Sequence, residues 1–148
     1  MHRRLRRPRQ SRIKEYNSLD MRKESLRLLE QSRHDFDTSA QLLKIKIYYA
    51  SVFFAEQAAE KALKALHIEK KRKAEFTHDL IELAQSLDAP RDVLKAAAEL
   101  SPDYIITRYP DAANGVPAAL YDEESAVAHL GYAGRIIKWV KQELILET

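Results

Sequence analysis

The chain has 148 residues, of which 45% are hydrophobic and 32% charged, and its formal net charge is +3 at pH 7. This length predicts a single domain whose hydrophobic core is large enough to fold without a metal or a disulfide. Cysteine is absent, which excludes disulfide bonds and thiolate zinc sites and favours a cytoplasmic protein.

The positive charge is concentrated at the N-terminus. Residues 1–14 contain seven basic residues and no acidic one, so the remainder carries a net negative charge. We interpret residues 1–20 as a basic, disordered leader and residues 21–148 as the helical domain, since blocks of like charge repel one another. Two alternatives stay open: an arm that binds phosphates, or a chain that starts at Met21. No apolar stretch is long enough for a membrane span, and none follows the basic residues as in a secretory signal.

Two long helices are expected first. Asp20 suits the N-cap of a helix over residues 21–45, because its carboxylate can accept hydrogen bonds from the free N–H groups of the first turn. The apolar residues of this helix recur at helical spacing and predict one buried stripe, formed by Leu26, Leu29, Phe36, Ala40, Leu43 and Ile47. A second helix is predicted over residues 48–70, as the central helix of a bundle. Its inner face is formed by Val52, Ala55, Ala59, Leu63 and Leu66.

A short pair of helices is expected next. Thr77 is the expected N-cap of a helix over residues 78–87. Pro90 suits the first turn of a helix over residues 91–106, since proline lacks the N–H group that is free there anyway. Residues 109–120 contain two prolines and a glycine and predict an irregular loop.

A long closing helix is predicted over residues 123–146, opened by Asp122. One face of it is apolar and contains Ala126, Leu130, Ala133, Ile137, Val140 and Leu144. No alternating pattern indicates a strand. The fold class is therefore all-α: a bundle of four to five helices, with two long antiparallel helices, a short pair and a long closing helix.

Three polar clusters interrupt this helical pattern. They are Glu-Gln-Ala-Ala-Glu-Lys-Ala-Leu-Lys at 56–64, Thr-His-Asp-Leu at 77–80, and Thr-Arg-Tyr-Pro-Asp at 107–111. Polar groups in a helical core cost free energy unless they are paired, so these clusters predict a shared site or interface. Together with their flanking residues 53–66, their order and spacing resemble the HEPN family of small helical domains.

The resemblance covers about residues 21–146 and implies a four- or five-helix bundle that forms homodimers. Many HEPN domains are encoded beside a minimal nucleotidyltransferase and form a toxin–antitoxin pair with it. Many are also metal-independent ribonucleases, whose site is an Arg followed after four to six residues by a His. No His follows Arg108 at that spacing, and the two pairs that have it end at His34 and His78, away from the late helix. The resemblance therefore implies the fold and the pairing more than a nuclease.

The candidate ligand-binding residues are Lys64, His78, Arg108, Tyr109 and Asp111. The planar guanidinium of Arg108 suits bidentate contact with phosphate, and Tyr109 can stack on a base or contact a second subunit. His78 lies near a helix N-terminus, which favours anions, and it is also a candidate neutral acid–base group. Structural alternatives stay open: a local salt bridge between Arg108 and Asp111, and a histidine that only bonds a neighbouring carbonyl. No catalytic residue is assigned.

A candidate polar cleft is formed by Glu56, Gln57, Glu60 and Lys61. Their spacing places Glu56 and Glu60 on one stripe of the second helix, and Gln57 and Lys61 on the neighbouring one. The alternative is an ordinary solvated face that contains a Glu60–Lys64 pair. No residues have the spacing of a metal site or of a glycine-rich phosphate loop, so no metal or cofactor is predicted.

These observations lead to one hypothesis and two alternatives. The hypothesis is a homodimeric HEPN-like protein that binds nucleotide or RNA phosphate as the non-catalytic or weakly catalytic partner of a minimal nucleotidyltransferase. The first alternative is a metal-independent ribonuclease toxin that uses Arg108 and His78. The second is a dimeric interaction module without a ligand.

Overall fold

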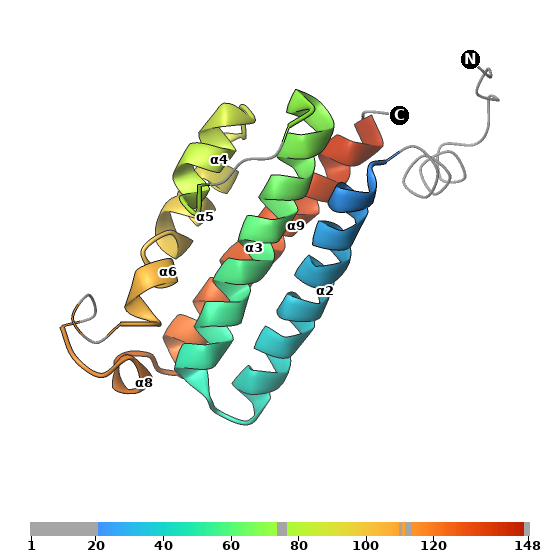
Figure 1. The fold of residues 1–148 in the computed structure, drawn as a ribbon. Helices are drawn as coiled ribbons and strands as arrows, with labels where there is room; N and C mark the ends of the chain where they lie inside the picture. Colours follow the sequence, from blue (N-terminus) through green and yellow to red (C-terminus); the bar gives the residue numbers. More distant parts are fainter. Residues whose placement is uncertain (1–20, 74–76, 110, 112–113, 147–148) are drawn as a thin grey trace, which may run out of the picture.

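The computed structural model describes residues 21–73, 77–109, 111 and 114–146. All regular structure within these residues is helical (Figure 1). The helices are α2 (Lys23–Lys44), α3 (Tyr48–Lys71), α4 (Leu80–Ser86), α5 (Arg91–Leu100), α6 (Asp103–Ile106), α8 (Pro117–Leu120) and α9 (Glu123–Leu146). The expected all-α bundle is confirmed, with α2 and α3 as the long antiparallel helices, α4 and α5 as the short pair and α9 as the closing helix. No helix in the described part of the chain is long and apolar enough to cross a membrane.

Helix α3 is the centre of the bundle (Figure 1). It contacts α2 and α9 along its length, and α4, α6 and α8 on a further side. Its predicted inner face is confirmed, because all five residues are fully buried: Val52, Ala55, Ala59, Leu63 and Leu66. Further buried alanines let neighbouring helices approach α3 closely, so the polar residues of α3 are held on a rigid element.

The face of α2 that packs on α3 is small and polar. Its fully buried positions are Ser25, Ser32, Asp35 and Ser39. The Ser32 hydroxyl donates to the carbonyl oxygen of Ala58 in α3 at 2.6 Å. Because the hydroxyls of the three serines find acceptors on α3, the serines can take the innermost positions with their polar groups paired.

The predicted apolar stripe of α2 lies beside the contact with α3 and is only partly buried, with Leu26, Leu29 and Phe36 packed against the core. Leu26, Leu29, Phe36, Ala40 and Leu43 are half-buried, and Ile47 is 39% exposed. The serines turn these apolar side chains away from α3, and Leu26, Leu29 and Phe36 line a groove toward α9.

The start of α2 also differs from the expectation. The helix begins at Lys23, and its N-cap residue is Arg22, without a side-chain cap, whereas the predicted cap Asp20 lies outside the described residues. A carboxylate from α3 binds this end instead. Glu69 accepts hydrogen bonds from the Arg22 N–H at 3.2 Å and the Ser25 hydroxyl at 2.6 Å.

The predicted cap of the third helix is corrected from Thr77 to Asp79. Helix α4 begins at Leu80, and the Asp79 carboxylate accepts from the N–H groups of Ile81 at 2.9 Å and Glu82 at 3.4 Å. The Thr77 hydroxyl accepts from the Asp79 N–H at 3.1 Å. Thr77 therefore supports the residue that caps the helix.

The predicted helix over residues 91–106 is divided into α5 and α6 at Pro102. Proline offers no N–H to continue the helical ladder, and its ring clashes with the preceding turn. The predicted loop over residues 109–120 contains the single turn α8, which begins at Pro117, a residue favoured at the first helical position.

Helix α9 has the predicted limits. The Asp122 carboxylate accepts from the Ser125 N–H at 2.8 Å, and the Ser125 hydroxyl accepts from the Asp122 N–H at 3.0 Å. This reciprocal arrangement is a capping box. Four of the six residues on the predicted apolar face are fully buried, whereas Leu130 and Ile137 are half-buried.

Candidate functional site

Polar side chains follow one face of α3, where α4 and α6 approach it. Glu56, Glu60 and Lys64 are one helical turn apart and lie on one stripe. His78, from the segment before α4, reaches Glu60, and Arg108 follows α6 and acts electrostatically on Glu56. We call these five residues the α3 polar site.

Glu60 is the centre of the α3 polar site. Its Oε2 atom lies 2.8 Å from Lys64 Nζ and 2.8 Å from His78 Nδ1. The Glu60 side chain is 6% exposed, whereas that of His78 is 49% exposed. A carboxylate oxygen accepts hydrogen bonds, so the His78 tautomer that fits this contact has its proton on Nδ1. The second oxygen of Glu60, Oε1, is buried and accepts no hydrogen bond from the described residues.

Glu56 is fully buried. Its Oε1 atom accepts a hydrogen bond from the Gln57 side-chain amide at 2.8 Å, and within the described residues Oε2 has no such partner. Burial is the largest influence and raises the pKa of the Glu56 carboxyl to about 8. The Gln57 amide lowers this pKa, and the charge of Glu60 raises it. At neutral pH Glu56 is therefore mostly protonated and uncharged.

The Arg108 side chain lies over an aromatic ring of α3. Its guanidinium carbon is 4.8 Å from the centre of the Phe53 ring, a cation–π arrangement that limits the orientations of the guanidinium. The neighbouring Thr107 is buried and donates to the carbonyl oxygen of Asp103 at 2.6 Å. The end of α6 therefore holds Arg108 beside Glu56 while leaving it exposed to solvent.

A second polar cluster joins α6 to α9, and sequence reasoning missed it. Asp103 is buried; its Oδ1 accepts from the Tyr121 hydroxyl at 2.7 Å, and its Oδ2 lies 2.9 Å from His129 Nε2. Burial lowers the pKa of His129, but the hydrogen bond to Asp103 and its charge outweigh that effect and raise it. Burial and then Asp103 raise the pKa of the Tyr121 hydroxyl. The cluster acts on Glu56, since the charge of Asp103 contributes to the raised pKa of that carboxyl.

Two of the residues predicted for the polar cleft, Gln57 and Lys61, lead from the α3 polar site toward α2. Lys61 forms an ion pair with the buried Asp35 of α2, with a distance of 2.8 Å between Nζ and Oδ2. Gln57 connects the two regions, because its side chain donates to Glu56 and accepts from Lys61 at 3.1 Å. Of the residues predicted for a polar cleft, Glu56 and Glu60 therefore belong to the α3 polar site, whereas Lys61 belongs to the α2–α3 contact.

The last two predicted residues lie at the surface after α6. Tyr109 is 55% exposed, and Asp111 is exposed as well. Both residues follow Arg108 within three positions of the chain. Within the described residues, no three histidine, aspartate or glutamate side chains are placed to hold a metal ion together.

The chain is therefore a small helical domain whose central helix carries buried carboxylates, with an arginine after the short helix α6. The chain matches the family model of the HEPN domain over residues 25–144. The chain belongs to the HEPN family.

Solved structures agree with this assignment. The crystal structure of TT1696 from Thermus thermophilus is similar with a TM-score of 0.76 and 33% sequence identity, over 82% of this chain and 98% of that chain. ST0689, described as an archaeal HEPN homologue, is similar with a TM-score of 0.72 and 28% identity, over 83% of this chain and 99% of that chain. A comparison with curated proteins gave no match.

Proposed function

We propose that this HEPN protein binds the phosphate of a nucleotide or of RNA at the α3 polar site. We also propose that it acts as the non-catalytic, homodimeric partner of a minimal nucleotidyltransferase in a toxin–antitoxin pair. The phosphate site is supported by the geometry around Glu60. The dimer and the transferase are supported by membership of the HEPN family.

The observation that carries the phosphate proposal is the position of Arg108, whose exposed guanidinium lies over the Phe53 ring beside Glu56. With a pKa of about 8, the Glu56 carboxyl contributes little negative charge at pH 7. Lys64 pairs with Glu60 on the same stripe of α3. A guanidinium beside an uncharged carboxyl keeps its positive charge available to attract an anion.

Phosphate would be held by groups that are already in place. Arg108 and His78 are exposed enough to be reached from solvent, and an incoming anion can share Lys64 Nζ with Glu60. The guanidinium suits two parallel hydrogen bonds to phosphate oxygens. The exposed ring of Tyr109 follows Arg108 directly and can stack on a base, as aromatic side chains do in sites for unpaired nucleotides.

Calorimetric titration of the full chain with ATP at pH 7 tests this proposal. We expect Arg108→Ala and Lys64→Ala each to weaken ATP binding about tenfold, as the loss of one charge-assisted contact does. Arg33→Ala is the matched control, because Arg33 is an exposed arginine of α2 outside the site. The basic residues 1–20 are present in every variant, so their binding of ATP cancels in the comparison.

Equal affinity of wild type and Arg108→Ala for ATP would overturn the proposed phosphate site. If the chain bound neither ATP nor RNA, it would be an interaction module without a ligand. Incubation of the chain with total RNA in EDTA tests whether the protein is instead a ribonuclease. Cleavage by wild type that is lost in Arg108→Ala would establish a metal-independent ribonuclease instead.

The partner proposals have their own tests. Sedimentation velocity reports whether the chain is a dimer. Purification of the tagged chain from its own cells, followed by mass spectrometry, reports whether a minimal nucleotidyltransferase accompanies it. A monomer without such a companion would contradict both proposals while leaving the phosphate site unaffected.

A further inference from the structure

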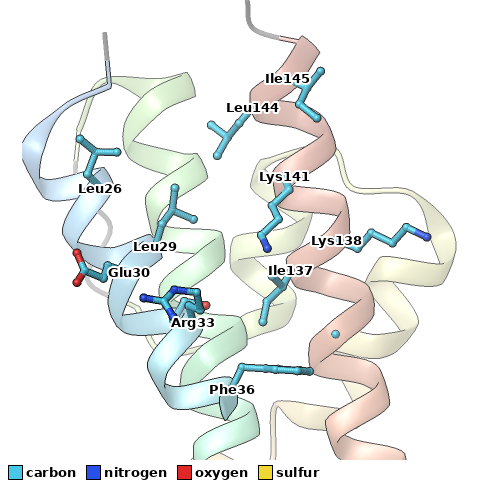
Figure 2. Close-up of a pocket in the computed structure, with 12 residues that line it drawn as sticks. Leu26, Leu29, Glu30, Arg33, Phe36, Ile137, Lys138, Lys141, Leu144 and Ile145 are labelled. Carbon is cyan, nitrogen blue, oxygen red and sulfur yellow. The ribbon is translucent and has the colours of Figure 1, made fainter. Parts of the chain in front are cut away.

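A groove lies between α2 and α9. Figure 1 shows α2 on the side of α3 opposite to α4 and α6, with α9 running behind α3. Both helices pack on α3, but between them they leave a volume of about 1070 Å³ (Figure 2). The serine face of α2 explains this arrangement. Because the serines occupy the contact with α3, the leucines of α2 are turned toward α9, where they form part of the groove floor.

The floor of the groove is apolar. It is lined by Leu26, Leu29 and Phe36 of α2, and by Ile137 and Leu144 of α9. Four of these five side chains are only half-buried, so a partner can still remove apolar surface from water there. The Phe36 ring lies against Gly134 of α9, with ring atoms 3.6 Å from the position that a Cβ would take there.

The rim of the groove is mainly basic. Arg33, Lys138 and Lys141 line it, with Glu30 as the acidic member. Figure 2 shows the Lys141 side chain extending from α9 into the space between the two helices. Glu30 and Arg33 have exposed local partners, His34 at 3.9 Å and Asp37 at 3.8 Å. Among the described residues, Lys138 and Lys141 form no ion pair. The basic rim therefore retains charge for a ligand above an apolar floor.

We propose that the α2–α9 groove binds an acidic amphipathic helix of a partner protein. The floor extends from Leu26 to Phe36, which at about 1.5 Å per residue is roughly 15 Å, or about three helical turns. Helices dock in such grooves through apolar residues at i, i+3, i+4 and i+7. Glutamates on the flanks of that stripe would meet Lys138 and Lys141.

Charge also argues against two other occupants. The segment 1–20 is rich in arginine, so it would bring like charge to the basic rim. A second copy of the chain placed by a two-fold axis would bring a second, mainly basic rim into the same interface, since a two-fold interface joins identical patches. This inference does not depend on the phosphate site, which lies on another face of α3.

A synthetic peptide tests the proposal. The probe is a fluorescent peptide of about 14 residues, four helical turns, with leucines at i, i+3, i+4 and i+7 and glutamates elsewhere. Its binding to the full chain is followed by fluorescence anisotropy. We expect saturable binding that Lys141→Glu weakens about tenfold and the double variant Lys138→Glu/Lys141→Glu weakens further, because rim charges set complementarity. Lys95→Glu, on the exposed face of α5, is the charge-matched control and should leave binding unchanged.

Three further measurements decide between occupants. Equal binding of a peptide with lysines in place of the glutamates, or of a scrambled acidic peptide, would overturn the proposal, because neither charge nor a helical stripe would then be recognised. Lack of binding to the designed peptide would also overturn it.

Two other occupants would give different results. Self-association of the chain that Lys141→Glu abolishes would assign the groove to a second copy. Displacement of the peptide by dodecanoate, at a lower concentration than unlabelled peptide requires, would assign the groove to an acyl chain.

Discussion

Ser39 and Ser51 exchange hydrogen bonds across the α2–α3 contact. The Ser39 hydroxyl donates to the carbonyl oxygen of Ser51 at 2.6 Å, and the Ser51 hydroxyl donates to the carbonyl oxygen of Ser39 at 2.9 Å. Both residues are fully buried. The pair joins the two helices close to their connecting turn, and Ser32 continues the same kind of contact two turns earlier in α2.

This contact makes the position of Ser39 sensitive to size more than to the loss of one hydroxyl. We expect Ser39→Ala to lower the free energy of unfolding by about 1 kcal/mol, the typical net value of one hydrogen bond. Ser39→Leu should lower it by a further 1–3 kcal/mol, roughly, because overpacking forces the helices apart. Urea denaturation measures both. Gln41→Leu, on the exposed side of α2, is the control and should stay near the wild-type value; equal losses for all three variants would contradict the serine contact.

Glu56 should make the protein less stable at alkaline pH. The folded-state pKa of about 8 lies above the ordinary value of 4.5, so the folded state binds a proton that the unfolded state releases between these values. The stabilising contribution of the protonated carboxyl is complete below pH 4.5 and is lost progressively as the pH rises to about 8. The total change is a few kcal/mol at most, from about 1.4 kcal/mol per pKa unit.

Glu56→Gln keeps the shape and the contact with Gln57 but removes the titration. We expect this variant to gain stability relative to wild type as the pH increases from 5 to 9, measured as the urea midpoint at each pH. Glu82→Gln, an exposed carboxylate of α4, is the matched control. Parallel pH profiles for wild type and Glu56→Gln would show that Glu56 ionises normally.

His129 and Asp103 should form a stabilising ion pair that fails at high pH. His129 gains its raised pKa in the folded state from Asp103, so its contribution is present below the ordinary pKa of histidine and is lost as the pH rises through the folded-state value. At pH 6, we expect His129→Ala to cost about 3 kcal/mol, since Asp103 would remain buried without its cation. An NMR titration of the imidazole checks the direction of the shift, and an imidazole that titrates below the ordinary histidine value would contradict it.

Asp79 should stabilise the protein by capping α4 and by connecting α4 to the end of α5. Its Oδ1 atom accepts from two N–H groups of α4 and from the Ser101 hydroxyl at the end of α5, at 3.1 Å. We expect Asp79→Ala to reduce the free energy of unfolding by about 1 kcal/mol. Asp79→Asn is the paired variant and should retain most of the stability, because asparagine caps helices nearly as well. A loss as large for asparagine as for alanine, in thermal unfolding, would speak against the capping role.

The helices that sequence reasoning placed best are those with local signals. The limits of α9 follow from Asp122 and Ser125, which are three residues apart, and α3 follows from a dense run of buried alanines and leucines. The orientation of α2 could not be found in the same way. Periodicity ranks leucine above serine as a core residue, whereas the serines are buried because acceptors on α3 lie 12 to 44 residues away.

The α3 polar site could be predicted in part for the same reason. Glu56, Glu60 and Lys64 share a stripe because they lie one turn apart on one helix, and His78 lies beside Glu60. Asp103 was missed because its partners follow it 18 and 26 residues later, across α8 and into α9. Nothing in the local sequence distinguishes it from an ordinary acidic residue in a first turn.

The carboxylate of Glu69 has a consequence for the order in which the protein is made and folds. It binds the N–H of Arg22, a residue 47 positions earlier in the chain, and the hydroxyl of Ser25. On the ribosome, the first turn of α2 therefore emerges well before the group that completes its hydrogen bonds. Because closing so long a loop has an entropic cost, this end of α2 should become ordered only after the last turn of α3 has formed, although it is the first part of the bundle to be synthesised.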